Sequence, residues 1–290
     1  MRERSLEEFE SIFEQAAIPV LEIENVALDS ISAVIRGRES DDAIIRTASY
    51  LATRFGSLVN LLWKADEASE AQLEGARQLR FTPAARPFAS TAELAAQVAD
   101  SRSRLVLWPQ VDSDGSAEEE LDALVRDVAP PVLLIHRPVH EPVDIFRKIL
   151  HSLTGNFQQT RNFAYSFRLA ETDATLTLLH AVAPNQLDDV REALRVSPDV
   201  AGQTGKELLE GMAHHGERFL KAVVAASRER PFNVAYRIAV GDVVPTVNEE
   251  LARGGYTLLV VGSHRNGHSH IGASDYQLMH TVTEIPVLAL

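Results

Sequence analysis

The sequence has no cysteine, and aromatic residues make up only 6% of its 290 residues. Without cysteine the chain can form no disulfide, no thiolate metal site and no cysteine nucleophile. No apolar run approaches the roughly 18 residues that a membrane-spanning helix needs, and Met1–Glu10 lacks the apolar region of a secretory signal. We therefore expect a cytoplasmic protein that is not inserted into a membrane.

Basic residues are also scarce, with 28 lysines and arginines against 41 aspartates and glutamates, giving a net charge of −13. The nearest approach to a basic stretch, Arg228–Arg230, is interrupted by a glutamate. Nucleic acid carries a dense negative charge and binds surfaces that concentrate lysine and arginine. The composition therefore excludes nucleic acid as a partner, and the acidic excess indicates solubility.

The residues that are present have the balance of a globular protein, with 45% apolar and 24% charged residues. This length fits one large domain or two of about 145 residues each. Short apolar runs alternate with segments of helical periodicity, and the second half repeats this order. Continuous apolar strands between helices are typical of a parallel sheet covered on both faces. The sequence therefore predicts an α/β fold of two tandem open-sheet αβα domains, each with five mostly parallel strands.

The predicted elements follow from periodicity and from capping residues such as Gly56 and Ser90. Strands are expected at 31–35, 58–63, 104–108, 131–135, 148–153, 175–182, 232–240, 257–261 and 286–290, with an edge strand within the proline-containing stretch 79–89. Helices are expected at 5–17, 41–55, 66–78, 91–99, 118–128, 157–170, 204–230, 241–252 and 274–283. We expect an N-terminal helix and extension over 1–30, one domain over 31–138 and a second over 144–290.

Three stretches of the second half, Asp173–Val182, Gly241–Val244 and Thr257–Leu290, resemble the universal stress protein family in its form with two domains per chain. The resemblance covers about 30–138 and 144–290. It implies a stress-response binding protein of the HUP, or adenine nucleotide alpha hydrolase-like, fold. It also implies that Val132–Ile135 and Val287–Leu290 pair antiparallel within one chain, as a pseudo-dimer. A protein partner and a homodimer are compatible with the family, and enzymatic activity beyond slow ATP hydrolysis is not expected.

In the nucleotide-binding branch of this family, ATP lies across the carboxyl ends of the strands, and a glycine-rich loop surrounds the phosphates. Glycines let the backbone approach a phosphate, and helix N-termini attract negative charge. The resemblance makes ATP a candidate cofactor of the second half and implies one set of contacts. These contacts are Thr154, Gly155, Val182, Gly241, Val243, Gly262, Arg265, Gly267 and Ser274.

The chain departs from the family's ATP motif at several positions. Thr154 stands where the family has an aspartate after the first strand, and Arg265 stands at the second glycine. The loop is about two residues short, and its closing pair falls on Ala273–Ser274, where Ser274 could cap the next helix and donate to a phosphate. In the first half, a loop with two aspartates over 109–117 replaces the glycine loop. We therefore expect the first half not to bind ATP.

Other readings of these residues stay open. Glycines between a strand and a helix also serve a loop that binds nothing, and Asn156 could act only as a helix cap. The histidines at 264, 268, 270 and 280 are spaced to meet on a metal, but imidazoles in an exposed loop are often only polar surface, and we expect no metal. Trp63 and Trp108 are expected to pack rather than stack on a base.

The sequence also leaves more than one function open. A degenerate regulatory module could bind no nucleotide and act through protein partners. An enzyme of the HUP fold is less favoured, because the chain contains no G-x-S-x-G, H-E-x-x-H or P-loop motif.

Overall fold

A computed structural model describes residues 21–65, 85–109, 115–139, 141–153, 161–182, 201–265 and 268–290. The helices expected at 5–17 and 66–78 lie outside these residues, as does Asn156. Side chains are described for most of this set but not for 85, 115–118, 161–162, 201–209, 263–265 or 268–270. Below, "first half" means the described residues up to 139 and "second half" those from 141 onward.

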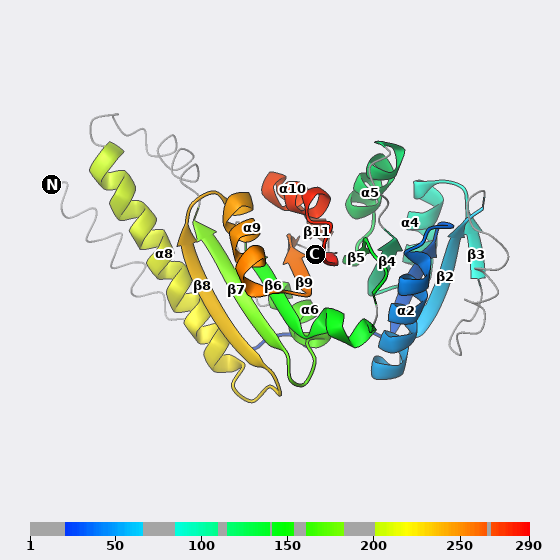
Figure 1. Cartoon of the computed structure of the whole chain (residues 1–290), viewed down its shortest axis with the longest axis horizontal. Coiled ribbons are helices and arrows are strands. Elements are labelled where there is room, and N and C mark those ends of the chain that lie inside the picture. The colour runs from blue at the N-terminus through cyan, green and yellow to red at the C-terminus, as the bar shows by residue number, and fades with distance from the viewer. Residues whose placement is uncertain are drawn as a thin grey trace.

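One sheet of ten strands runs through the whole protein (Figure 1). Its spatial order is β3-β2-β1-β4-β5-β12-β9-β6-β7-β8, so each half contributes five neighbouring strands. The strands of the first half are β1 (Ser30–Ile35), β2 (Leu58–Lys64), β3 (Ala85–Phe88), β4 (Leu105–Pro109) and β5 (Val132–Ile135). The strands of the second half are β6 (Lys148–Leu153), β7 (Thr175–Val182), β8 (Asn233–Val240), β9 (Leu258–Val261) and β12 (Val287–Ala289). The predicted α/β fold with five strands in each half is confirmed.

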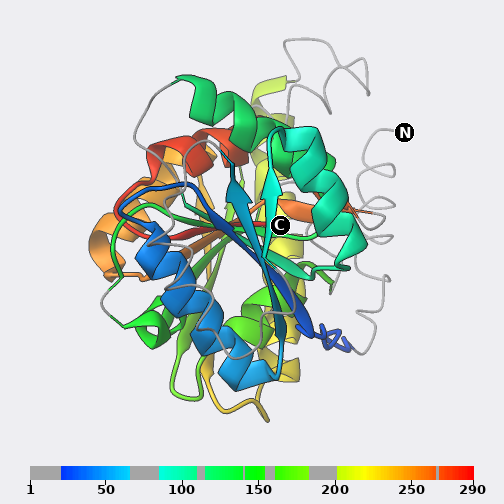
Figure 2. The same ribbon diagram turned by 90° about the vertical axis from the view of Figure 1, so that its right-hand side faces the viewer.

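Helices cover both faces of this sheet. The first half contains α2 (Asp41–Phe55), α4 (Thr91–Asp100) and α5 (Gly115–Asp127). The second half contains η1 (Pro142–Phe146), α6 (Arg161–Leu169), α8 (Ala201–Ala226), α9 (Val243–Gly254) and α10 (Ala273–Thr281). Buried side chains of α2, α6 and α8 share one core, and those of α4, α5, α9 and α10 share another. Figure 2 shows α2 and α4 on opposite faces of the first-half strands.

No helix in the described ranges combines the length and the apolar character needed to cross a bilayer.

The two halves meet at their closing strands. β12 pairs antiparallel with β5, and Leu288 lies opposite Leu133. Every other described pairing in the ten-stranded sheet is parallel. Each closing strand is fully buried, so the pairing protects two apolar edges that would otherwise attract other strands. The predicted antiparallel pairing within one chain is therefore confirmed.

Several local predictions rest on backbone chemistry and are also confirmed. Gly56 ends α2 in the left-handed region, with φ of 70°, where a side chain would be strained. Ser90 caps α4 by accepting a hydrogen bond from the Glu93 amide (3.3 Å). Pro87 lies in β3, which is at the edge of the sheet, where a missing N–H costs least.

Three predictions near the ends of elements are wrong. The helix predicted to reach 230 ends at Ala226, because the Ser227 hydroxyl donates to the Val224 carbonyl (2.7 Å) and competes with the helical bond. The expected glycine loop after β9 contains a hairpin of β10 (Ser263–Arg265) and β11 (His268–His270). Ser274 does not cap α10, because this helix begins at Ala273 and its N-cap is Gly272.

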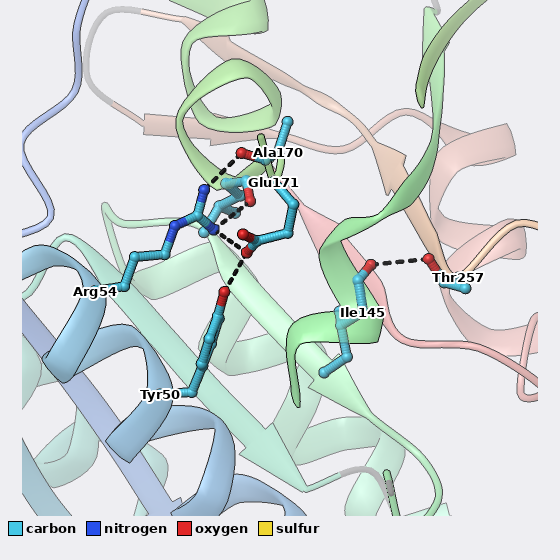
Figure 3. Close-up of polar contacts among 7 residues, drawn as sticks. Tyr50, Arg54, Ile145, Ala170, Glu171 and Thr257 are labelled. Atoms are coloured by element: carbon cyan, nitrogen blue, oxygen red, sulfur yellow. Dashed lines mark hydrogen bonds and ion pairs between the residues drawn. The ribbon is translucent and has the colours of Figure 1, made fainter. Parts of the chain in front are cut away.

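A polar cluster fastens α2 of the first half to the second half (Figure 3). Arg54 donates from Nη1 to the Leu169 carbonyl (2.8 Å) and from Nη2 to the Ala170 carbonyl (2.6 Å). It also pairs with Glu171 at 2.5 Å, and the Tyr50 hydroxyl donates to the same carboxylate. These carbonyls lie at the end of α6, so the guanidinium satisfies acceptors that the helix leaves unpaired.

A second contact joins the halves on the opposite face of the sheet. Asp122 of α5 accepts a hydrogen bond from the Tyr276 hydroxyl of α10 and lies 3.1 Å from Nε2 of His280. With the β5–β12 pair between the two polar contacts, the two halves are held together across the whole thickness of the molecule.

Candidate functional site

Each half has one switch point, where the strand order changes direction along the chain. In the first half it lies between β1 and β4, and in the second half between β6 and β9. Open α/β sheets bind ligands at the carboxyl ends of the strands on either side of such a point. Each half therefore has one candidate crevice.

The strand register aligns the two crevices residue by residue. In the first half Ile31 pairs with Val59 and Leu105, and in the second half Ile149 pairs with Leu176 and Leu258. Counting from these pairs towards the carboxyl ends of the strands shows which residues occupy equivalent positions in the two halves. At three of these positions the first half has a large residue and the second half a smaller one. Arg36, Lys64 and Trp108 correspond to Thr154, Ala181 and Val261.

A charged cluster occupies the first-half crevice. The Arg36 side chain is only 1% exposed, and its Nη2 lies 2.8 Å from a Glu120 carboxylate oxygen. The other oxygen of Glu120 lies 2.6 Å from Nζ of Lys64. The Arg36 guanidinium carbon stands 5.1 Å from the ring centre of buried Trp108, in the geometry of a cation–π contact. Trp108 is buried, as predicted, and the face of its ring contacts the guanidinium of Arg36.

The turn that leaves β1 is fixed by a buried carboxylate. Asp41, at the start of α2, accepts hydrogen bonds from the Arg36 amide (3.2 Å) and the Arg38 amide (3.0 Å). Burial raises the pKa of Asp41 above its ordinary value, and the backbone hydrogen bonds partly oppose that shift. The backbone donors that follow β1 thus serve the protein's own carboxylate.

Small residues line the described part of the second-half crevice. Ala181 is the last residue but one of β7, and Val261 ends β9. Gly262 follows Val261 with φ of 86°, a left-handed conformation that favours glycine. Here the backbone can approach a ligand closely, because Gly262, the residue directly after β9, has no side chain.

The N-terminus of α9 points to the same end of the sheet. Val243 begins this helix after Gly241 and Asp242, and the Asp242 side chain makes no capping hydrogen bond. The Gly241 amide donates to the Val182 carbonyl (3.1 Å), and the Val182 side chain is fully buried. A Cβ at Gly241 would lie 3.3 Å from Oγ1 of Thr246, so the backbone at Gly241 passes close to the Thr246 side chain.

The N-terminus of α10 already has an anion of its own. Asp275 is 2% exposed, and its carboxylate accepts a hydrogen bond from the Gly272 amide (3.2 Å). A phosphate at this helix end would compete with that carboxylate for the same positive end of the helix. Any phosphate site here is therefore weakened.

Comparison with known proteins places the second half in a family. The family model described as Universal stress protein family matches residues 146–288. The C-terminal half of the chain belongs to the universal stress protein family. No curated protein matches the chain.

Solved structures related to the chain extend over both halves. A functionally unknown protein from Pseudomonas aeruginosa PAO1 is 17% identical, with 91% of this chain and 92% of that chain covered and a TM-score of 0.62. A universal stress protein from Archaeoglobus fulgidus DSM 4304 is 9% identical, with 89% and 94% covered and a TM-score of 0.57. The cytoplasmic domain of a prokaryotic cation chloride cotransporter is 13% identical, with 91% and 95% covered and a TM-score of 0.51. At these identities the likeness shows a common fold.

The structure describes only part of the nucleotide site expected in the universal stress protein half. Thr154, Gly155 and Gly267 lie outside the described residues, and Arg265 is placed only by its backbone in β10. The remaining expected contacts all lie at the carboxyl ends of the strands or in the segments that follow them, and these are Val182, Gly241, Val243, Gly262 and Ser274. Their role in binding stays a prediction.

Sequence reasoning missed three groups near the two crevices. The Arg36–Glu120 pair and Asp275 were not predicted from the sequence. A signal was present, because Glu120 and Asp275 each lie eleven residues before a Pro-Val-Leu segment that closes its half. His180, near the end of β7, was also missed. Its Nδ1 lies 3.3 Å from the Leu153 carbonyl, and burial lowers its pKa below the ordinary value. A neutral imidazole therefore lies beside the universal stress protein crevice.

A small cavity lies at the other end of the strands of the universal stress protein half. Its volume is about 210 Å³, and its wall includes Ile145, Thr257 and Pro286. Figure 3 shows Thr257 donating its hydroxyl to the Ile145 carbonyl beside it (3.1 Å). Ligand pockets usually measure about 300–1,000 Å³, so this cavity is too small for a nucleotide.

Proposed function

We propose that the chain is a cytoplasmic stress-response binding protein whose second half binds ATP weakly and whose first half does not. One observation carries the proposal: the same strand positions hold Arg36, Lys64 and Trp108 in the first crevice but small residues in the second. We expect no enzymatic activity beyond slow ATP hydrolysis.

The proposed contacts follow the geometry of the second crevice. Thr154 and Gly155 come directly after β6. Val182 ends β7, and Gly241 and Val243 lie at the corner between β8 and α9. On the other side Gly262, Arg265, Gly267 and Ser274 span the hairpin and the start of α10. Glycine backbone and a helix N-terminus suit a phosphate chain, and the guanidinium of Arg265 can grip two phosphate oxygens.

Two features make the proposed ATP affinity weak. The loop after β9 has arginine in place of one glycine, and Asp275 already accepts a hydrogen bond from an amide at the start of α10. A hydrogen bond to a charged group contributes about 1.5–3 kcal/mol. Loss of one or two such bonds weakens binding by about one to four decades, at ~1.4 kcal/mol per decade.

Replacement of Arg265 tests this assignment. The variant Arg265→Ala is expected to lose detectable ATP binding in isothermal titration, because the guanidinium offsets the loss of backbone donors. Its thermal stability should stay close to that of the wild type, since Arg265 lies in a hairpin outside the ten-stranded sheet. Arg253→Ala is the matched control, because Arg253 is 67% exposed and pairs only with neighbouring Glu249 in the described contacts. Full ATP binding by the Arg265 variant would refute the assigned role.

A second candidate function is a regulatory module that binds no nucleotide and acts through a protein partner. The fold shared with the cytoplasmic domain of a prokaryotic cation chloride cotransporter favours it, since there the same fold belongs to a transport protein. Denaturing the purified protein and measuring the mass of any released small molecule distinguishes the two functions. Released ATP supports the first function. If no nucleotide is released and added nucleotide does not bind, the second function is supported.

A further inference from the structure

One carboxylate of the first half contacts two side chains of the last helix of the second half. Asp122 of α5 accepts a hydrogen bond from the Tyr276 hydroxyl, and its other oxygen lies 3.1 Å from Nε2 of His280. The two rings pack on each other, with their centres 4.4 Å apart. The side chains of Asp122 and His280 are 22% and 13% exposed, so their contact is largely shielded from water. Figure 1 shows α5 and α10 side by side.

This contact fixes the start of α10. Tyr276 closes the first turn of the helix, because its amide donates to the Gly272 carbonyl (2.8 Å). His280 follows one turn later on the same face, about 6 Å along the helix axis. Two points of attachment at this separation set both the position of the helix and its rotation about its own axis. The first turn, which contains Ser274, is therefore placed by the first half.

The helix α10 depends on such contacts because it is short. It has nine residues, and helices shorter than about 12–15 residues are marginal in isolation. Leu278 and Met279 are fully buried and hold α10 on the sheet, whereas Tyr276 and His280 attach it to α5. Loss of the second attachment leaves the helix on the sheet but frees its first turn to shift.

The pseudo-twofold symmetry of the two halves does not repeat this contact. Alignment of the two closing Pro-Val-Leu segments makes Leu121 the counterpart of Tyr276, and Val125 is then the counterpart of His280. Both counterparts are buried, and neither carries a hydrogen-bonding side chain. A symmetric interface makes each contact twice, whereas here only the second-half helix is held by a carboxylate of the other half.

We propose that Asp122 is a positioning residue for the nucleotide site of the second half, so that the half without a nucleotide site completes that of the other half. This inference rests on the proposed function. Asp122 acts through Tyr276 and His280, which place the first turn of α10, rather than by touching the nucleotide. The backbone of β11, in the loop expected around the phosphates, also lies against α5. The one-sided contact and the one-sided nucleotide site then have the same cause.

Isothermal titration of the full chain with ATP and magnesium tests the inference through Asp122→Ala. We expect the affinity for ATP to fall about tenfold, a size usual for coupling between separate sites, because the first turn of α10 is no longer fixed. The change of charge alone acts in the opposite direction, since loss of a negative charge near an anionic ligand favours binding. A weaker affinity therefore cannot arise from the change of charge.

Three control variants separate positioning from charge and from stability. Asp122→Asn removes the same charge but keeps an oxygen that accepts from the Tyr276 hydroxyl, so it should retain most of the affinity. Glu119→Ala removes an exposed acid from the same helix and should not weaken binding. Tyr50→Phe removes a hydrogen bond between the halves on the opposite face of the sheet. It should lower the free energy of unfolding and leave the affinity for ATP unchanged.

The possible results separate this inference from the proposed function. Equal affinity in the wild type and in Asp122→Ala overturns the inference and leaves the proposed function standing. Equal losses in Asp122→Ala and Asp122→Asn also overturn it, because the hydrogen bond from Tyr276 then has no part in binding. Absence of ATP binding by the wild type overturns the proposed function and the inference with it.

A second variant decides the matter if Asp122→Ala does not fold. Tyr276→Phe keeps the ring and the charge of the cluster and removes only the hydroxyl that donates to Asp122. It should weaken ATP binding while thermal melting shows a folded protein. Affinity equal to that of the wild type would overturn the inference.

Discussion

Replacement of His151 by asparagine is expected to reduce the acid sensitivity of the protein. His151 lies in β6 with no exposed surface, and its Nδ1 is 2.9 Å from the Ser166 hydroxyl. Its ring packs against Phe163 at 5.7 Å between centres. Burial lowers the pKa of His151 from 6.5 to about 3, because water cannot solvate the protonated ring.

The sign of the pH effect follows from this lowered pKa. Between about pH 6.5 and 3 the unfolded chain binds a proton at residue 151 and the folded protein does not. The contribution of the neutral, buried His151 to stability is therefore fully present above pH 6.5 and is lost as the pH falls towards 3. At about 1.4 kcal/mol per pH unit, the loss is on the order of 5 kcal/mol.

Denaturant unfolding at several pH values measures this effect. The wild type should lose free energy of unfolding steeply below pH 6.5, and His151→Asn should show a shallower dependence. Val260→Ala is the control, since Val260 lies opposite His151 on β9 and is equally buried. It should lower the free energy of unfolding at every pH without changing the slope. Equal slopes for the wild type and the His151 variant would contradict the prediction.

Replacement of Arg54 by alanine is expected to lower the free energy of unfolding by about 2–4 kcal/mol. Arg54 is 22% exposed and Glu171 13% exposed, so the ion pair is largely shielded from water. Its loss leaves the Leu169 and Ala170 carbonyls without this donor and Glu171 without its cation. Arg54→Lys should restore only part of the stability, because an ammonium lacks the fork that reaches three acceptors.

Arg46 offers a matched control on the same helix. It is 44% exposed and pairs with Asp42, which is 71% exposed. Exposed pairs of this kind usually contribute less than about 1 kcal/mol, so Arg46→Ala should change the stability little. Chemical denaturation followed by circular dichroism measures both variants. A loss for Arg54→Ala no larger than that for Arg46→Ala would show that the contact between α2 and α6 is not stabilising.

The same contact predicts a loss of stability in alkaline solution. Burial, with the hydrogen bond to Glu171, raises the pKa of Tyr50 from 10 to about 12. The associated stability is fully present below pH 10 and is lost as the pH rises through 12. Tyr50→Phe should remove this dependence.

Much of the fold could be predicted from the sequence, but the contacts between charged residues at the crevices could not. Continuous apolar strands, Gly56 after α2 and Pro87 in an edge strand are local signals, and the structure agrees with each of them. The antiparallel pairing of the two closing strands, β5 and β12, was expected from the family resemblance, and the structure adds its register. The domain boundaries at 31–138 and 144–290 stay predictions.

The contacts that sequence reasoning missed join residues far apart in the chain. Arg36 meets Glu120 and Arg54 meets Glu171 only after the sheet has brought them together, and neither spacing has a recognisable period. The hairpin after β9 was missed for a different reason. Its strands are three residues long and polar, so they lack the apolar alternation that marks a strand.

The central claim is that a nucleotide binds the second half and not the first. Isothermal titration of the full chain with ATP and magnesium tests it most directly through the number of sites. We predict one weak site per chain that Arg265→Ala removes and Arg36→Met leaves unchanged. Two sites per chain, or a single site that Arg36→Met removes and Arg265→Ala spares, would contradict the claim.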